Sequence, residues 1–236
     1  MTIFWELFQE LGNFLTPIYK KLSEPPIPNL MGDRDVEHSW ITANMPEGPG
    51  LALDFGCGPF SLGLVAARKG FSVTAIDLEP VIWYYVHPSL SFLQGDILKL
   101  TLPSDQYDLI INCSSIEHVG LAGRYGVTES RPDGDIEAMA MLKTLLKPGK
   151  FMLLTIPVGR DQLFKPLHRV YGQDRLPKLL KGWEIVKKEC WIKDKLNCWN
   201  CVEESVALAT EPVKHRYGLG LFVLRRPESN DNHNHK

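Results

Sequence analysis

Residues 51–58 (LALDFGCG) constrain the fold of this chain more than any other segment. A short apolar run there leads directly into an acid and two alternate glycines. Residues 61–68 then place apolar side chains at helical spacing, so the pattern predicts a strand, a tight glycine turn and a helix. The next apolar run, residues 71–76, ends at Asp77, about 20 residues beyond the glycines, where an acid can bind ribose hydroxyls. We therefore expect a βαβ unit whose turn lets the backbone approach an adenine-containing cofactor.

The pattern beyond this unit alternates helices with apolar strands. Further strands are expected at 90–93, 107–112, 151–156, 183–191 and 220–224, and helices at 135–146 and 176–180. The strand at 151–156 is wholly apolar, which indicates burial on both faces of a parallel sheet. The predicted fold is α/β: a doubly wound, mainly parallel seven-stranded Rossmann-like sheet with an antiparallel edge strand and an N-terminal helical cap. We expect residues 158–175 to form a polar and aromatic loop, and the stretch between the last two strands to be irregular.

Three segments are predicted: a helical cap or lid at 1–45, the α/β domain at 46–226 and a polar, disordered tail at 227–236. Residues 3–22 have apolar side chains at helical spacing, so this helix either lies on a membrane or covers the active site or a subunit partner, as in a homodimer. Its nearly neutral polar face favours the second interpretation. Arg34, just upstream of the first strand, would suit a cofactor carboxylate.

The composition argues against a nucleic-acid-binding protein, a disulfide-rich protein and an integral membrane protein. The net charge of −2 supplies no global basic field for nucleic acid, and five scattered cysteines are typical of reduced thiols in a cytoplasmic enzyme. No apolar run approaches the roughly 20 residues of a membrane span, so no integral membrane segment is expected. The N-terminus lacks a basic leader, and we predict no signal peptide.

The motifs resemble those of the class I S-adenosylmethionine-dependent methyltransferases over residues 50–157. In that family an acid two residues before the glycines begins the cofactor loop, as Asp54 does here, and a second acid binds the ribose, matching Asp77. A Gly-Asp pair after the third strand places its carboxylate near the adenine amino group, matching Asp96. The resemblance implies S-adenosylmethionine as cofactor and S-adenosylhomocysteine as product. The predicted cofactor-binding residues are Arg34, Asp54, Gly56, Cys57, Gly58, Asp77, Leu78, Asp96, Ile97, Cys113 and Ser114.

Two features qualify the resemblance. The family often has a third alternate glycine where this chain has Phe60. Residues 115–135 look like a poorly characterised subgroup that is associated with sugar or polysaccharide modification. A small-molecule or sugar-like acceptor, methylated at oxygen, is therefore the predicted substrate.

A hydroxyl acceptor needs a base with a pKa near the working pH, and His118 follows the fourth strand at the edge where open α/β sheets bind ligands. His118 is the predicted catalytic base, and Glu117 is predicted to orient it or to bind substrate. The loops around the fifth strand supply the predicted substrate-binding residues Arg124, Tyr125, His168, Arg169 and Tyr171.

Other functions fit less well. A nicotinamide-dependent oxidoreductase needs a third glycine where Ser61 stands, and it leaves the Gly-Asp pair at 95–96 unexplained. An RNA methyltransferase is not supported, because the net charge is slightly negative and the motif of base N-methylation is absent after the fourth strand. A non-catalytic subunit that binds the cofactor remains an alternative. The CxxC pair Cys198 and Cys201 has no recognised partners for zinc, and helix capping explains Asp135 more simply than magnesium does, so no metal is predicted.

Overall fold

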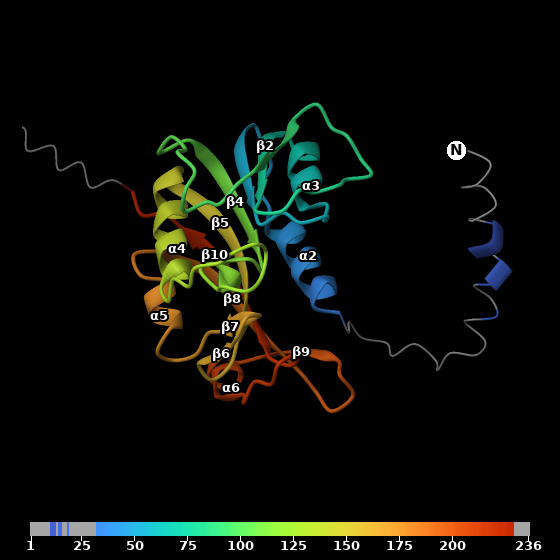
Figure 1. Ribbon diagram of the computed structural model, residues 1–236, viewed down its shortest axis with the longest axis vertical. Helices are drawn as coiled ribbons and strands as arrows, with labels where there is room; N and C mark the ends of the chain where they lie inside the picture. Colours follow the sequence, from blue (N-terminus) through green and yellow to red (C-terminus); the bar gives the residue numbers. More distant parts are fainter. Residues whose placement is uncertain (1–9, 13, 16–17, 19–31, 229–236) are drawn as a thin grey trace, which may run out of the picture. The chain divides into compact units, whose positions relative to one another are not determined.

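The computed structural model describes residues 10–12, 14–15, 18 and 32–228 (Figure 1). The chain divides into two compact units, residues 1–30 and 31–236. In the first unit the described residues are helical, and most of the helix expected at 3–22 lies outside the described residues, as does the tail from residue 229. The second unit begins before α2 (Asp33–Asn44), so Arg34, which was expected in the cap, belongs to the same unit as the sheet.

An eight-stranded sheet forms the centre of the second unit, in the order β3-β2-β1-β4-β5-β10-β8-β9. The strands are β1 Gly50–Phe55, β2 Phe71–Asp77, β3 Leu90–Gln94, β4 Tyr107–Cys113, β5 Leu146–Val158, β8 Glu184–Lys193, β9 Trp199–Val202 and β10 Gly218–Arg225. The strands β1 to β5 pair with one another in parallel, whereas β10 is antiparallel to both β5 and β8. The doubly wound, mainly parallel α/β fold is confirmed.

The sheet extends one strand beyond the predicted seven. The extra strand, β9, pairs antiparallel with β8 and forms the edge. It contains Cys201, while Cys198 immediately precedes it, so the CxxC spacing belongs to a hairpin. Both thiols are free. Among the described residues, no cluster of histidine, cysteine or acidic side chains could hold a metal ion.

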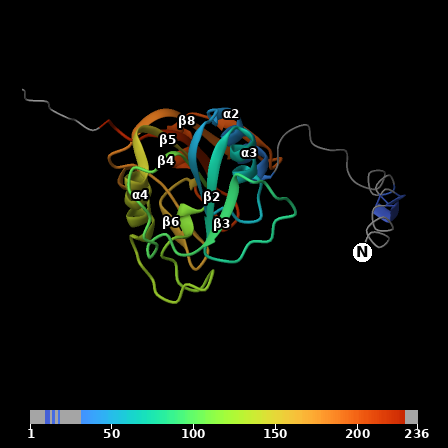
Figure 2. The same ribbon diagram turned by 90° about the horizontal axis from the view of Figure 1, so that it is seen from above.

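Helices cover both faces of the sheet (Figure 2). Helices α2 (Asp33–Asn44) and α3 (Leu62–Arg68) lie on one face, and α4 (Gly134–Leu145) lies on the other. Helix α5 (Leu176–Leu179) shares a core cluster with α4. Alternation along β4 supplies both layers, because Ile111 packs with Ile41 of α2 while Ile110 packs with Met139 of α4. The consecutive apolar residues of the strand are therefore buried on both sides, as expected for a covered parallel sheet.

Three short elements appear where the sequence predicted loop or irregular structure. The hairpin of β6 (Gln162–Phe164) and β7 (His168–Val170) lies within the expected loop, α6 (Glu204–Ala209) precedes β10, and a 3-10 turn, η1 (Ile116–His118), follows β4. Strands of three residues are too short for a periodic signal, so the loop prediction was wrong there. None of the described helices combines the length and apolarity needed to cross a membrane.

The order of the strands reverses between β1 and β4, because β2 and β3 lie on one side and β5 on the other. Open α/β sheets bind ligands beyond the carboxyl ends of the strands at such a point. The fold therefore places the glycine turn after β1 and the segment after β4 next to each other.

Candidate functional site

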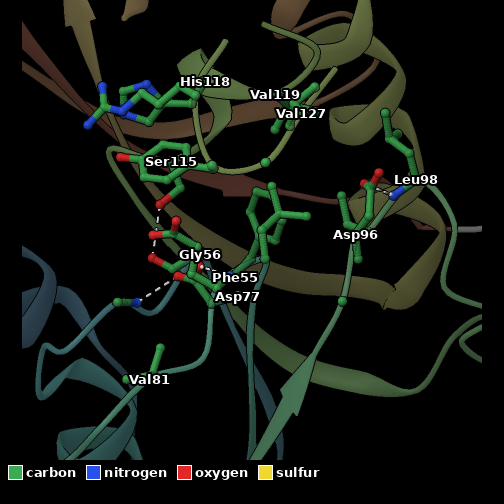
Figure 3. A pocket seen from close by; sticks show the side chains of 18 of the residues that line it. Phe55, Gly56, Asp77, Val81, Asp96, Leu98, Ser115, His118, Val119 and Val127 are labelled. Atoms are coloured by element: carbon green, nitrogen blue, oxygen red, sulfur yellow. Dashed lines mark hydrogen bonds between the residues drawn. The ribbon is translucent and has the colours of Figure 1, made fainter. Parts of the chain in front are cut away.

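A pocket of about 870 Å³ opens at the carboxyl ends of β1, β2 and β4. Figure 3 shows His118 and Ser115 on one side of this pocket and Asp96 and Leu98 on the other, with Phe55, Gly56 and Asp77 between them. The loop after η1, which includes Val119 and Val127, closes the upper side in this view. The pocket thus combines four segments that were identified from the sequence: the glycine turn, Asp77, the Gly-Asp pair at 95–96 and the segment after β4.

The glycine turn is held tightly at Gly56. The carbonyl oxygen of Ile76 accepts hydrogen bonds from the backbone N–H groups of Gly56 (2.8 Å) and Cys57 (3.2 Å). The backbone of Gly56 has φ of 67°, and a Cβ there would lie 2.2 Å from Oγ of Ser115. Ser115 in turn donates a hydrogen bond to the carbonyl oxygen of Gly56 over 3.0 Å. Glycine is required at this position both for its conformation and for the approach of the loop after β4.

Two carboxylates line the pocket where β2 and β3 end. Asp77, at the end of β2, accepts hydrogen bonds from the backbone N–H groups of Gly58 (2.9 Å) and Glu79 (3.1 Å). Asp96 accepts one from the N–H of Leu98 over 3.0 Å. These backbone bonds fix both side chains while leaving them on the pocket wall.

Most of the predicted cofactor-binding residues lie on the pocket wall, and two lie behind it. The residues on the wall are Arg34, Gly56, Gly58, Asp77, Leu78, Asp96, Ile97, Cys113 and Ser114. Asp54 and Cys57 are buried and do not line the pocket. Burial raises the pKa of Asp54 to about 7. Its carboxylate lies next to Gly63 near the start of α3, so it supports the turn from inside.

His118 lies at the side of the pocket that is opposite Asp96. Its Nδ1 is 2.6 Å from the carbonyl oxygen of Leu167, and a carbonyl can only accept, so Nδ1 carries the proton. The Nε2 atom is then the unprotonated nitrogen of the neutral ring. Burial lowers the pKa of His118 to about 4, so the imidazole is neutral at physiological pH, but this pKa lies below the working pH, near which the pKa of a base was expected.

Glu117 is buried beside this histidine. Its Oε1 lies 3.6 Å from Nε2 of His118, and among the described residues its Oε2 has no hydrogen-bond partner. Burial raises the pKa of Glu117 to about 8, so the side chain is protonated at neutral pH. Glu117 does not line the pocket.

The buried carboxyl of Glu117 makes stability depend on pH. Between its ordinary pKa of 4.5 and about 8, the unfolded chain releases the proton while the folded chain keeps it, so stability falls as pH rises through this range. Glu117→Gln removes this loss. The variant should be more stable than the wild type at pH 8 by about 1 kcal/mol or more, with a smaller difference at pH 5. Urea unfolding at both pH values measures the difference, and an equal difference at the two would contradict a protonated Glu117.

Arg124 and Tyr125 line the pocket next to His118. The Arg124 guanidinium donates to the carbonyl oxygen of Leu167 over 3.2 Å and lies 4.4 Å from the centre of the Tyr125 ring. The Tyr125 ring packs edge-on against His118, with 5.7 Å between ring centres. The Leu167 carbonyl therefore ties both His118 and Arg124 to the β6–β7 hairpin.

The other three predicted substrate-binding residues do not reach the pocket. Arg169 is buried and donates hydrogen bonds to four backbone carbonyls, those of Glu117, Val119, Arg131 and Pro132. Tyr171 is fully buried and donates to Asp135 over 3.0 Å. His168 is buried against Tyr217, with 5.1 Å between ring centres. Asp135 is also buried, and it pairs with Arg175 instead of capping α4. These residues hold the loop after β4 in place.

Sequence reasoning missed two groups of residues at the site. Glu37 of α2 is completely buried and accepts a hydrogen bond from Thr155 of β5 over 2.7 Å, and it also pairs with Arg34 and Ser114. Trp83 donates to the carbonyl oxygen of Gly58 over 3.1 Å and supports the glycine turn from outside. No local pattern marks either contact, because each joins segments that are distant in the sequence.

Comparisons with known proteins agree with this geometry. Residues 52–130 match the family described as Methyltransferase domain, and residues 98–211 match one described as Caenorhabditis protein of unknown function, DUF268. The putative methyltransferase YqeM of Bacillus subtilis is 35% identical over 80 residues, which are 31% of this chain and 32% of the relative. The ubiquinone biosynthesis O-methyltransferase of Escherichia coli is 28% identical over 145 residues, or 57% of this chain and 58% of the relative. The chain thus spans less than two thirds of these curated relatives.

Solved structures share the fold. The 1,6-didemethyltoxoflavin-N1-methyltransferase of Burkholderia thailandensis, crystallised with S-adenosylhomocysteine, has a TM-score of 0.54 at 15% identity, covering 82% of this chain and 76% of that one. The [4+2]-cyclase SpnF has a TM-score of 0.57 at 15% identity, covering 93% and 94%. At these identities the likeness establishes the Rossmann-like fold.

Proposed function

We propose that this chain, which belongs by fold and by its domain match to the class I S-adenosylmethionine-dependent methyltransferases, transfers a methyl group from S-adenosylmethionine to a small acceptor. One observation carries the proposal: Asp77 and Asp96 follow the neighbouring strands β2 and β3 at the carboxyl end of the sheet, on one side of the glycine turn after β1, in the order that an adenosine group requires. The shared fold alone would not suffice, because folds of this kind host several chemistries.

The residues present fit this cofactor. Close packing of Ser115 against Gly56 fixes the glycine turn, and Asp77 and Asp96 on the pocket wall offer acceptors for ribose hydroxyls and an amino group. Arg34, at the opposite end of the pocket wall beside Cys113, would bind the cofactor carboxylate. When bound, the cofactor supplies an activated methyl group on a sulfonium.

We propose an oxygen atom of a small, sugar-like molecule as the acceptor and His118 as the base. The neutral Nε2 of His118 accepts the hydroxyl proton as the oxygen attacks, while the Leu167 carbonyl holds the ring in the required tautomer. Tyr125 and Arg124 bind the acceptor beside it. Much of the rate enhancement would come from holding the acceptor oxygen in line with the methyl group. The five free cysteines agree with a cytoplasmic protein.

Calorimetric titration of S-adenosylmethionine, S-adenosylhomocysteine and NADH into the purified protein tests the cofactor. Micromolar binding of both adenosyl compounds without binding of NADH is the expected result. Binding of NADH alone would contradict the proposed function and favour an oxidoreductase.

Asp77→Ala should weaken binding of S-adenosylhomocysteine by about 10- to 100-fold, because a charged hydrogen-bonding group contributes roughly 1.5–3 kcal/mol. Glu47→Ala is the control, since Glu47 is an exposed carboxylate that pairs with Lys69 and does not line the pocket. The same calorimetric titration measures both variants. An unchanged affinity of the Asp77 variant would remove the ribose-binding role.

A further inference from the structure

The side chain of Glu37 connects α2 to the ends of two strands at the pocket. Its carboxylate is fully buried and accepts hydrogen bonds from Ser114, just after β4, and from Thr155 of β5, the latter at 2.7 Å. Its other oxygen pairs with Arg34, one turn earlier on the same helix. A buried carboxylate is costly unless its partners are in place, so this group defines a single position for α2 over the site.

Arg34 lies between this carboxylate and the pocket. The contacts described for its guanidinium use Nη1, which pairs with Glu37 and lies 3.9 Å from Sγ of Cys113. Burial opposes its charge, but the adjacent Glu37 carboxylate outweighs that and raises the pKa of Arg34 above its ordinary value. Among the described residues, Nη2 and Nε have no hydrogen-bond partner, and the side chain lines the pocket. Two donors in a planar fork are what a carboxylate ligand requires.

The aromatic ring of Phe60 packs against the same guanidinium. The centre of the guanidinium lies 5.2 Å from the centre of the Phe60 ring, and the imidazole of His38 packs edge-on against that ring at 5.2 Å. Phe60 stands where the resembling family often has a third alternate glycine. An arginine over an aromatic face is attracted to it and loses rotational freedom. Phe60, which replaces the third glycine of the family pattern, thus provides the surface against which Arg34 and His38 of α2 pack.

We propose that Glu37 and Phe60 are positioning residues that hold the Arg34 fork in place for the carboxylate of the amino-acid portion of the cofactor. This inference rests on the proposed function. It assigns recognition of the two ends of the cofactor to different parts of the chain: the ends of β2 and β3 for adenosine, and α2 for the amino acid.

Two ligands that differ in the amino-acid group separate the contribution of Arg34 to binding from that of the residues proposed to bind adenosine. S-adenosylhomocysteine carries the amino-acid group, whereas 5′-methylthioadenosine has the same adenosine and thioether without it. Glu37→Gln keeps an oxygen that can accept from Thr155 but removes the charge that holds Arg34. We expect it to weaken binding of S-adenosylhomocysteine by about 10-fold and that of methylthioadenosine by less than about twofold, measured by calorimetry. Phe60→Leu, which leaves the buried carboxylate untouched, should show the same selective loss at roughly threefold.

Asp33→Asn is the matched control on the same helix. Asp33 binds Lys193 (3.0 Å) and Tyr217 (3.2 Å), so this variant loosens α2 without touching the partners of Arg34, and both affinities should stay as in the wild type. An equal loss for both ligands, or no loss, in Glu37→Gln and Phe60→Leu would overturn the positioning role. A wild-type protein that binds both ligands equally well would also overturn it while leaving the proposed function intact. A wild type that binds neither would refute the proposed function itself.

Discussion

Asp135→Ala should lower the free energy of unfolding by about 3–5 kcal/mol, the usual cost of removing one partner from a buried ion pair. The carboxylate of Asp135 is completely buried and accepts hydrogen bonds from Tyr171 Oη (3.0 Å) and Arg175 Nε (2.9 Å), and it lies 3.6 Å from Nε of Arg169. Without it, the buried guanidinium of Arg169 would keep its charge but lose its counter-ion. Urea unfolding monitored by circular dichroism measures the change.

Asp133→Ala provides the matched control two residues away. Asp133 also contacts Arg175, at 3.2 Å, but its side chain is 66% exposed. An exposed ion pair contributes little, so this variant should lose less than about 1 kcal/mol. Equal effects of the two substitutions would contradict the buried network. The difference between the two variants also tests whether Arg169 and Tyr171 stabilise the fold. Both contact Asp135, and neither lines the pocket.

The sequence predicted the fold well because its central strands are buried on both faces. In β4 the consecutive residues Leu109, Ile110 and Ile111 are all inaccessible to solvent, so a continuous apolar run was a sufficient signal. The β6–β7 hairpin and β9 gave no such signal. Their strands are three or four residues long, and Leu163 and Cys201 are exposed, so pairing with neighbours stabilises them more than their own pattern does.

The part of the pocket around the glycine turn and Asp77 was predictable for a related reason. A glycine turn after an apolar strand and an acid at the end of the next strand are local features, and the parallel sheet brings Gly56 and Asp77 to one edge. The buried polar residues were not predictable. Charged side chains are usually exposed, so Arg169 was assigned to substrate and the burial of Glu37 was not expected, although both are buried. Their partners are distant in the sequence: Thr155 lies 118 residues beyond Glu37.

His118→Asn tests whether His118 is the base that removes the proton of the acceptor hydroxyl. The asparagine amide can still donate toward the Leu167 carbonyl, but it cannot accept a proton, so the loop should keep its place while the base is lost. With an acceptor found by screening hydroxylated small molecules, sugars first, kcat should fall about 10²- to 10⁴-fold, as expected for loss of a general base. Affinity for S-adenosylhomocysteine, measured by calorimetry, should stay within about twofold of the wild type, since no charged contact to the cofactor is removed.

The pH dependence of the wild type distinguishes this base from an ordinary imidazole. A base acts when unprotonated, and burial lowers the pKa of His118 to about 4, so kcat/KM should remain level as pH falls to about 5 and decline only near 4. The His118→Asn variant should lose this acidic decline together with its turnover. A decline centred near the ordinary histidine value of 6.5 would place the base on a more exposed group. Full turnover in the variant would exclude His118 as the base, and another group would then remove the proton of the hydroxyl acceptor.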